Sequence, residues 1–319
     1  MSKRRIAVIG AGPVGSILAA HLSNAEHEVH LVEVQAHLME AIKEKGLQIV
    51  GVEELYARVD EVYQEIEQLK GIPLDQVYIC SKAIDLPAVS RSLEDLGLTH
   101  TDYISYQNGI DNEQVLAKHF PKERVFRTVV NYAGMITRPG VVRMTFFHPP
   151  NHIGQIVPEG VERAKELAQL MNEVGIETRY AECVQKEAWR KSILNSVLMP
   201  VSVTTRLTMA RIMETPSLSA IVESLMKDFV EVARCEGYDY GPDFEKNAIE
   251  YLATAGDHKP SMLMDFEGGR PLEIDYLNNK IQEYADKHGV TCAYNKLLCS
   301  VIHGLLIDRD VVNGKQANA

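Results

Sequence analysis

The sequence lacks the cysteine and histidine patterns of a disulfide framework or a metal site. Its five cysteines are an odd number, are widely scattered and include no Cys-x-x-Cys pair. This spacing argues against both a disulfide scaffold and a zinc site, and it indicates free thiols in a reducing compartment. The eleven histidines show no His-Glu-x-x-His or comparable ligand spacing. We therefore expect no metal.

The chain also lacks long apolar runs and an excess of positive charge. No apolar run reaches the length of about eighteen residues that a membrane-spanning helix requires. The formal net charge is -11, whereas a nucleic-acid-binding protein usually carries a basic face. The first residues, MSKRRIAVIGAG, are basic and then apolar, but glycines interrupt the apolar part and no cleavage site follows. We expect a cytoplasmic protein with no nucleic-acid or membrane partner.

The first part of the chain alternates between strand and helix patterns. With 319 residues, 45% of them hydrophobic, the chain is long enough for two domains that each have a core. The pattern predicts strands at 4–10, 27–34, 74–82 and 102–109, helices at 13–25 and 36–46, and a β-hairpin over 124–146 with a Pro139-Gly140 turn. This alternation is typical of the α/β class, with a doubly wound parallel sheet of the Rossmann type.

Long helical patterns replace this alternation from about residue 184. Helices are expected at 187–201, 216–237, 242–254, 271–288 and 294–307. We therefore predict a Rossmann dinucleotide-binding domain over residues 1–183 and an all-α domain over residues 184–319. The helical domain is expected to bind substrate and to mediate a homodimer. The polar end of the chain, DRDVVNGKQANA, is expected to fray.

The stretch IAVIGAGPVGS contains a Gly-x-Gly-x-x-Gly motif between a predicted strand and a predicted helix. In this context Gly10 permits a tight turn, Gly12 lets the backbone approach a pyrophosphate, and Gly15 allows close helix–strand packing. The helix N-terminus offers free N–H groups to the anion. We expect the cofactor-binding turn to comprise Gly10, Gly12, Pro13, Val14 and Gly15. The alternative is a glycine-rich turn without a ligand.

The second predicted strand ends at Glu33, eighteen residues beyond Gly15. An acidic residue at this place typically accepts hydrogen bonds from the ribose hydroxyls of adenosine and would repel a 2′-phosphate. No arginine or lysine lies between Glu33 and Lys43 to receive such a phosphate. The pattern favours NAD over NADP. The alternative is that Glu33 is a solvated carboxylate and a distant basic residue binds the phosphate.

Polar residues follow two further predicted strands. Lys82 follows the third long apolar strand, and Gln107-Asn108-Gly109 follows the next one. Ligands of an open α/β sheet bind outside the carboxyl ends of the strands, so Lys82 and Asn108 are candidates to border the nicotinamide. Because Gln-Asn-Gly is also an ordinary turn sequence, position alone leaves both interpretations open.

A second group of candidates lies in the stretch EAWRKSILNSVLMP, residues 187–200. Lys191 and Asn195 are four residues apart, so they project from the same face of the predicted helix. A carbonyl that accepts hydride develops negative charge on its oxygen and needs a proton donor or a cation there. A partly buried lysine meets both needs, since burial lowers its pKa toward neutrality. The spacing alone fits ordinary surface residues equally well.

Six stretches together carry a family resemblance: IGAGPVGS, CSKAIDLP, QNGIDNE, EAWRKSILNSVLMP, KPSMLMDFEGGRPLEIDYLNNKI and ADKHGVTCAYNKLL. With them the chain resembles the ketopantoate reductases (2-dehydropantoate 2-reductases), in which a Rossmann domain precedes a helical domain. The resemblance covers roughly residues 4–308. The last three stretches, in this order and spacing, are much more specific than the glycine motif.

The resemblance implies a role for each candidate. Lys191 is expected to be the general acid that protonates the keto oxygen, and Glu273 is expected to bind the substrate hydroxyl and to orient this lysine. Ser261 is expected to contact the substrate carboxylate. Asn108 is expected to hold substrate and nicotinamide in place, with Lys82 bordering the same site. The resemblance also implies an NAD(P)H cofactor, usually NADPH.

Two positions depart from the family pattern. Members commonly have a second asparagine eight residues after the lysine, whereas this chain has Met199 there, on the same helix face as Asn195. Asn195 and Met199 are both expected to contact the substrate. A site that loses a hydrogen-bonding partner usually changes what it accepts, so Met199 suggests a 2-keto acid with a more apolar branch than ketopantoate. Glu33 occupies a position where NADPH-using members tend to have a basic or neutral residue.

The sequence therefore supports one leading hypothesis and several alternatives. The leading hypothesis is reduction of a branched 2-keto acid to the (R)-2-hydroxy acid with NAD(P)H. A related NAD-dependent D-2-hydroxyacid dehydrogenase with a more apolar substrate is the first alternative. Opine, glycerol-3-phosphate and 6-phosphogluconate dehydrogenases share the domain layout, but the specific motifs disfavour them. The last alternative is a non-catalytic nucleotide-sensing protein, which the retained lysine and glutamate disfavour.

Overall fold

The computed structural model describes residues 3–254 and 256–312 and divides into two compact units. The first unit ends at Ala188 and the second begins at Trp189, five residues after the boundary predicted from the sequence. The first turn of helix α6 (Val184–Thr205) lies in the first unit because Val184 and Ala188 pack against Val129 in one apolar cluster.

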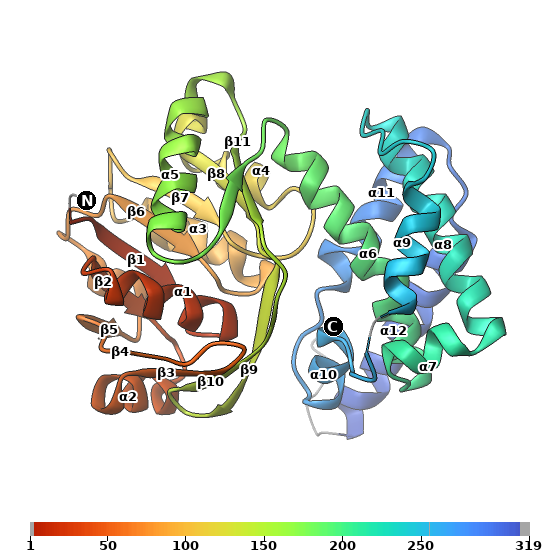
Figure 1. The fold of residues 1–319 in the computed structure, drawn as a ribbon, viewed down its shortest axis with the longest axis horizontal. Coiled ribbons are helices and arrows are strands. Elements are labelled where there is room, and N and C mark those ends of the chain that lie inside the picture. Colours follow the sequence, from red (N-terminus) through yellow and green to blue (C-terminus); the bar gives the residue numbers. More distant parts are fainter. Residues whose placement is uncertain (1–2, 255, 313–319) are drawn as a thin grey trace. The chain divides into compact units, whose positions relative to one another are not determined.

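An eight-stranded sheet forms the centre of the first unit, in the order β12-β11-β8-β7-β6-β1-β2-β5 (Figure 1). Its strands are β1 Arg5–Ile9, β2 Glu28–Val32, β5 Glu61–Tyr63, β6 Gln76–Ile79, β7 Asp102–Ser105, β8 Val125–Val129, β11 Asn151–Gln155 and β12 Thr178–Tyr180. All pairings are parallel except that of β11 with β8. The strand order reverses between β1 and β6, so the carboxyl ends of these two strands flank the crevice where α/β sheets bind nucleotides.

Helices cover both faces of this sheet, as the alternating strand and helix patterns predict. The helices are α1 Pro13–Asn24, α2 Ala36–Lys45, α3 Leu86–Glu94, α4 Asn112–Leu116 and α5 Val161–Glu173. Alternate residues of β1 belong to two different cores: Ile6 and Val8 pack with residues of α1 and α5, and Ala7 and Ile9 pack with residues of α3. A strand buried on both faces explains the continuous apolar run. The doubly wound fold is confirmed.

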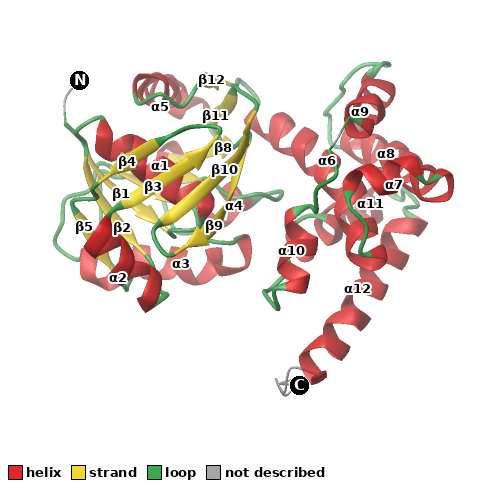
Figure 2. Cartoon of the chain, turned by 60° about the horizontal axis from the view of Figure 1, so that its bottom comes forward, coloured by secondary structure: helices red, strands yellow, loops and turns green. Residues whose placement is uncertain are grey.

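A second, four-stranded sheet in the order β4-β3-β10-β9 lies over α1 (Figure 2). Its strands are β3 Leu47–Gly51, β4 Leu55–Ala57, β9 Tyr132–Arg138 and β10 Val141–Phe147. The predicted hairpin was therefore wrong at its start, because β8 belongs to the large sheet and only β9 and β10 form the hairpin. Its turn is where the sequence places it, with Gly140 at a φ of +78°. The short strands β3, β4 and β5 were not predicted.

The second unit is entirely helical over its described residues. It contains α6 from Trp189 onward and six further helices. These are α7 Met209–Glu214, α8 Pro216–Cys235, α9 Phe244–Ala253, α10 Ser261–Glu267, α11 Asn278–His288 and α12 Ala293–Val312. The prediction of one helix over 271–288 was wrong, because α11 begins only at Asn278 and a short 3-10 turn, η5 (Ile274–Tyr276), precedes it. Leu277, with φ −116° and ψ −88°, breaks the helical path between them.

Three observations on the described residues concern membrane-spanning helices, metal sites and cysteines. None of their helices is both long and apolar enough to cross a membrane. No group of three or more histidine, cysteine, aspartate and glutamate side chains among them is arranged to hold a metal ion. All five cysteines are free thiols.

Candidate active site

The glycine turn between β1 and α1 tolerates no side chain at two of its three glycines. A Cβ on Gly10, which has a φ of +101°, would lie 2.9 Å from the backbone nitrogen of Ser81. A Cβ on Gly15 would lie 2.0 Å from the carbonyl oxygen of Gly10. At Gly12, by contrast, no described atom other than those of Gly12 and its neighbours along the chain lies within 4 Å of an added Cβ. The backbone at Gly12 therefore faces open space, as close approach of a pyrophosphate requires.

The start of α1 suits an anion. Pro13 occupies the first position of the helix and the first turn contains no acidic side chain, so the N–H groups of Val14 and Gly15 are available to a ligand. The Ser16 hydroxyl donates to the carbonyl of Ala11 (2.9 Å), which stabilises the turn. These residues fit the pyrophosphate of a dinucleotide.

Glu33 lies just past the end of β2 and is hydrogen-bonded to the glycine turn. Its Oε2 accepts from the backbone N–H of Ala11 (3.0 Å) and its Oε1 accepts from the backbone N–H of Gln35 (2.8 Å). Only 5% of Glu33 is exposed, so this carboxylate is held in the structure rather than solvated. Its negative charge is fixed beside the turn, where the ribose of a dinucleotide would bind.

Gln107 joins the segments that follow β6 and β7. The side-chain amide of Gln107 donates to the carbonyl of Lys82 (3.1 Å). The next residue, Asn108, is held separately, because its carbonyl accepts from the side-chain amide of Asn112 (2.7 Å). Gly109 has a φ of +112°, a conformation that favours glycine. Lys82 and Asn108 thus lie on adjoining loops at the carboxyl edge of the sheet, as predicted from their positions after strands.

Two buried ionisable residues, Arg127 and Glu113, lie close to this loop and were missed from the sequence. Arg127, on β8, donates to the hydroxyl of Ser105 (2.9 Å) and to the carbonyl of Gly109 (2.9 Å). Glu113, on α4, is also buried, and burial raises the pKa of its carboxyl while the charge of Arg127 opposes this rise. The signal was present in VFRTVV, where one arginine interrupts an apolar strand.

In the helical unit, one face of α6 carries three of the predicted residues. Lys191 and Asn195 are half-buried, and Met199 is 9% exposed. They follow one another at intervals of one helical turn. Trp189, just before them, is buried, with its ring 5.0 Å from that of Tyr284 on α11 in an edge-on contact. This contact holds the start of the face against α11.

Met199 connects this face to the segments that carry Ser261 and Glu273. It belongs to an apolar cluster that includes Met262, next to Ser261, and Leu272 and Ile274, on either side of Glu273. Ser261 is the exposed first residue of α10, and Glu273 is half-buried at the start of η5. Residues far apart in sequence are thereby brought around one cluster.

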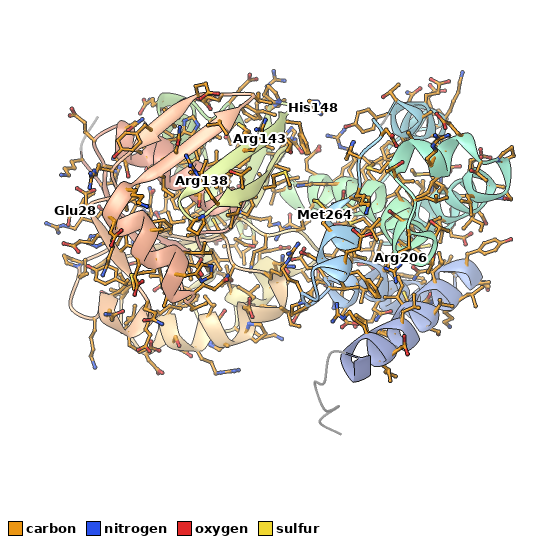
Figure 3. The ribbon with its side chains drawn as sticks, turned by 90° about the horizontal axis from the view of Figure 1, so that it is seen from below. Glu28, Arg138, Arg143, His148, Arg206 and Met264 are labelled. Carbon is orange, nitrogen blue, oxygen red and sulfur yellow. The ribbon has the colours of Figure 1, made fainter. Side chains whose placement is uncertain are left out.

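Arg206, at the end of α6, adds a contact with α10. Figure 3 labels Arg206 and Met264 on the helical unit, and the guanidinium of Arg206 lies 3.9 Å from the centre of the Phe266 ring. Arg206 has a φ of +63°, which ends the helix. The part of α6 in the helical unit is therefore packed against α11 near Trp189 and against α10 near Arg206. These two contacts hold the face between them in place.

The two units define a class of protein. A Rossmann unit whose glycine turn suits a pyrophosphate, followed by an all-helical unit, is the layout of NAD(P)-dependent oxidoreductases. Two family models match the chain: "Ketopantoate reductase PanE/ApbA" over residues 6–157 and "Ketopantoate reductase PanE/ApbA C terminal" over residues 183–306. The chain belongs to the ketopantoate reductase family.

Individual relatives agree with the family assignment over nearly the whole chain. A 2-dehydropantoate 2-reductase of Pyrococcus abyssi is 28% identical, over 98% of this chain and 100% of that protein. Among solved structures, a D-mandelate dehydrogenase with NADH and anilino(oxo)acetate has a TM-score of 0.87 at 24% identity, covering 96% of this chain and 99% of that one. A PanE/ApbA family ketopantoate reductase from Ralstonia eutropha JMP134 gives the same values. These two structures support the fold.

Proposed function

We propose that this protein reduces a branched 2-keto acid, 2-dehydropantoate or a close analogue, to the (R)-2-hydroxy acid with NAD(P)H. The observation that carries the proposal is the apolar cluster of Met199, Met262, Leu272 and Ile274, which packs the helix that carries Lys191 and Asn195 against the segments that carry Ser261 and Glu273. A cation, an amide, a hydroxyl and a carboxylate match the carbonyl, carboxylate and hydroxyl of such a substrate and product. The activity named for the curated relatives supports the same reaction.

In the proposed mechanism, the glycine turn of Gly10, Gly12 and Gly15 would hold a dinucleotide, whose dihydronicotinamide would supply the hydride for the keto carbon. Lys191 gives a proton from its Nζ to the keto oxygen, which neutralises the charge that develops there. Glu273 accepts a hydrogen bond from the new hydroxyl and orients the lysine. Ser261 binds the substrate carboxylate, and Asn108, with Lys82 beside it, holds the reacting groups in place. The products are the 2-hydroxy acid and the oxidised cofactor.

We further propose that NADH is preferred over NADPH. The support is Glu33, whose buried carboxylate is fixed by the amides of Ala11 and Gln35 beside the turn. A 2′-phosphate near this carboxylate would meet like charge without the arginine that NADP-binding sites usually supply. The nicotinamide cofactor itself follows from the family.

A second candidate function is an NAD-dependent D-2-hydroxyacid dehydrogenase with a more apolar substrate. The observation that favours it is Met199, which contributes a thioether to an apolar cluster where the family commonly has an amide. An apolar branch on the substrate would meet no unpaired polar group there, whereas the hydroxyl of ketopantoate would lose a partner.

The test is a steady-state comparison of NADH and NADPH with 2-dehydropantoate, 2-ketoisovalerate and a phenyl-substituted 2-keto acid. The proposal expects turnover of at least one of these acids and a higher kcat/KM with NADH. If kcat/KM is highest for 2-dehydropantoate, the protein is a ketopantoate reductase; if it is highest for an apolar acid, the second candidate holds. Tight cofactor binding without oxidation by any of the acids would contradict both and favour a nucleotide sensor.

We also propose that the protein is a homodimer formed through its helical unit. The support is an apolar stripe on α12, where Tyr294, Leu297 and Val301 are all exposed at helical spacing. Light scattering coupled to size-exclusion chromatography tests this proposal. A monomer at micromolar concentration would contradict it.

A further inference from the structure

Helix α6 contains a proline in its interior. Pro200 lies five residues before the end of the helix at Thr205, and proline has no N–H to donate to the carbonyl one turn earlier. That carbonyl belongs to Ser196, whose residue is fully buried. A buried carbonyl without a donor is costly, so the helix needs a donor from elsewhere at this point.

Asn278 supplies this donor. Its side-chain nitrogen lies 2.9 Å from the carbonyl oxygen of Ser196 and 2.9 Å from Oδ1 of Asn295. Because both neighbours are acceptors, the NH₂ group of Asn278 must face them. Asn295 in turn donates to the backbone carbonyl of Asn278 (3.0 Å) and to Oε1 of Gln282 (3.2 Å). Asn278 and Asn295 are fully buried, so the orientation of the Asn278 amide is fixed on both sides.

This hydrogen bond joins the two segments that carry the proposed acid and its partner. Ser196 follows Asn195 directly and comes five residues after Lys191, while Asn278 comes five residues after Glu273. We propose that Asn278 is a positioning residue: it replaces the N–H that Pro200 lacks and thereby fixes α6, with Lys191, relative to the segment of Glu273. The roles of Lys191 and Glu273 in this inference rest on the proposed function, whereas the replacement of the missing donor does not.

The arrangement predicts a specific rescue. In a Pro200→Ala variant, residue 200 regains an N–H that can donate to the carbonyl of Ser196 within the helix. In this variant, loss of the Asn278 amide should have a smaller effect on kcat and on hydrogen exchange in α6. Four proteins are compared with the wild type: Pro200→Ala, Asn278→Leu, the double variant, and Asn279→Leu as a matched control. Asn279 is the next residue, and its side chain donates to Asp275 rather than to α6.

We expect Asn278→Leu to lower kcat with the best keto acid by about 10- to 100-fold, with the KM for the cofactor changed less than about 2-fold, because a misplaced α6 affects the chemical step. The alkaline limb of the kcat–pH profile should shift as the surroundings of Lys191 change. Pro200→Ala and Asn279→Leu should remain near the wild type. The double variant should regain at least about half of the loss on a logarithmic scale, together with the wild-type pH profile.

Hydrogen exchange measured by mass spectrometry tests the same bond without any substrate. Asn278→Leu should speed exchange in α6 around residues 196–203, and the double variant should restore protection. This readout stands even if no keto acid is turned over, so failure of the proposed function and failure of the inference are distinguishable. If Asn278→Leu alone does not fold, comparison of the double variant with Pro200→Ala makes the same measurement.

Three results would overturn the inference. One is an Asn278→Leu variant that matches Asn279→Leu in kcat and in exchange. Another is a double variant no better than Asn278→Leu, since the proline would then not create the need for the amide. The third is an Asn278→Leu variant with a lower melting temperature but an unchanged pH profile and kcat, which would show a purely structural role.

Discussion

The guanidinium of Arg127 donates to the carbonyl of Gly109 at 2.9 Å and thereby anchors the loop that contains Asn108. The same group donates to the hydroxyl of Ser105 at the end of β7. One buried cation thus connects a strand to the loop proposed to hold the substrate. The charge of Arg127 also opposes the rise that burial causes in the pKa of Glu113.

The buried Arg127 and Glu113 give a prediction about how the stability of the protein depends on pH. Burial raises the pKa of Glu113 above its unfolded value, with Arg127 opposing the rise, so the stability that Glu113 contributes is fully present below the unfolded pKa and is lost as pH rises through the folded one. A Glu113→Gln variant should therefore gain stability relative to the wild type as pH increases through this window, by at most about 1.4 kcal/mol per pH unit. Urea unfolding between pH 4 and 8 measures the difference. A constant difference would contradict the assignment.

Removal of Arg127 should be more harmful than removal of Glu113. Arg127→Met removes the buried hydrogen bonds to Ser105 and Gly109 and the cation that opposes the rise in the pKa of Glu113, and it should cost about 1–3 kcal/mol or more. Adding Glu113→Gln to Arg127→Met should recover part of this loss. Equal unfolding free energies for the single and double variants would show that the two charges do not interact.

Gly12 and Gly15 should separate cofactor binding from folding. Gly15→Ala places a methyl group 2.0 Å from the carbonyl of Gly10 and should cost about 3 kcal/mol or more of stability. Gly12→Ala meets no described atom within 4 Å other than those of its neighbours along the chain, so its melting temperature should change little while its Kd for NADH rises by about 10-fold or more. Thermal unfolding and fluorescence titration with NADH distinguish the two. Unchanged NADH binding by Gly12→Ala would place the pyrophosphate elsewhere.

Glu33 should determine which nicotinamide cofactor is preferred. Glu33→Arg is expected to shift the ratio of kcat/KM values toward NADPH by about 10-fold or more, because it replaces a repulsive charge with an attractive one. It also removes the acceptor of the Ala11 and Gln35 amides, so a stability loss of about 1–3 kcal/mol accompanies it. Glu33→Gln keeps an acceptor and is the control. No shift in Glu33→Arg would refute the ribose assignment.

Met199 should set the polarity of the accepted substrate. Met199→Asn restores the amide common in the family and should raise the ratio of kcat/KM for 2-dehydropantoate over 2-ketoisovalerate by about 10-fold. The new amide enters an apolar cluster and should cost about 1–3 kcal/mol of stability. Met199→Leu keeps the cluster apolar and should leave the ratio near that of the wild type. An unchanged ratio in Met199→Asn would mean that Met199 only packs the core.

Local sequence patterns predicted the parts of this molecule that depend on local rules. The turn at Gly10 and Gly15, the burial of strand β1 and the end of α2 at Gly46, with a φ of +74°, all follow from spacing and backbone conformation. Lys191 and Asn195 were placed on one helix face for the same reason. Their chemical meaning came from the family resemblance.

Features that depend on long-range contacts were not predicted. The sheet of β3, β4, β9 and β10 pairs strands from distant parts of the chain, and its short strands carry little periodicity. Leu277, which delays the start of α11, lies in a sequence that otherwise has a helical pattern. The partnership of Asn278 with Ser196 could be suspected only from Pro200, because a proline inside a helix leaves a carbonyl to be satisfied.

The proposed role of Lys191 is tested most directly by single-turnover oxidation of NADH, monitored by absorbance, in the wild type and in Lys191→Ala with the best keto acid. If Lys191 is the proton donor, Lys191→Ala should slow hydride transfer by about 10²- to 10⁴-fold, while its Kd for NADH, measured by fluorescence, should stay within about 2-fold of the wild type. Hydride transfer at the wild-type rate in Lys191→Ala would contradict the assignment of this lysine as the proton donor.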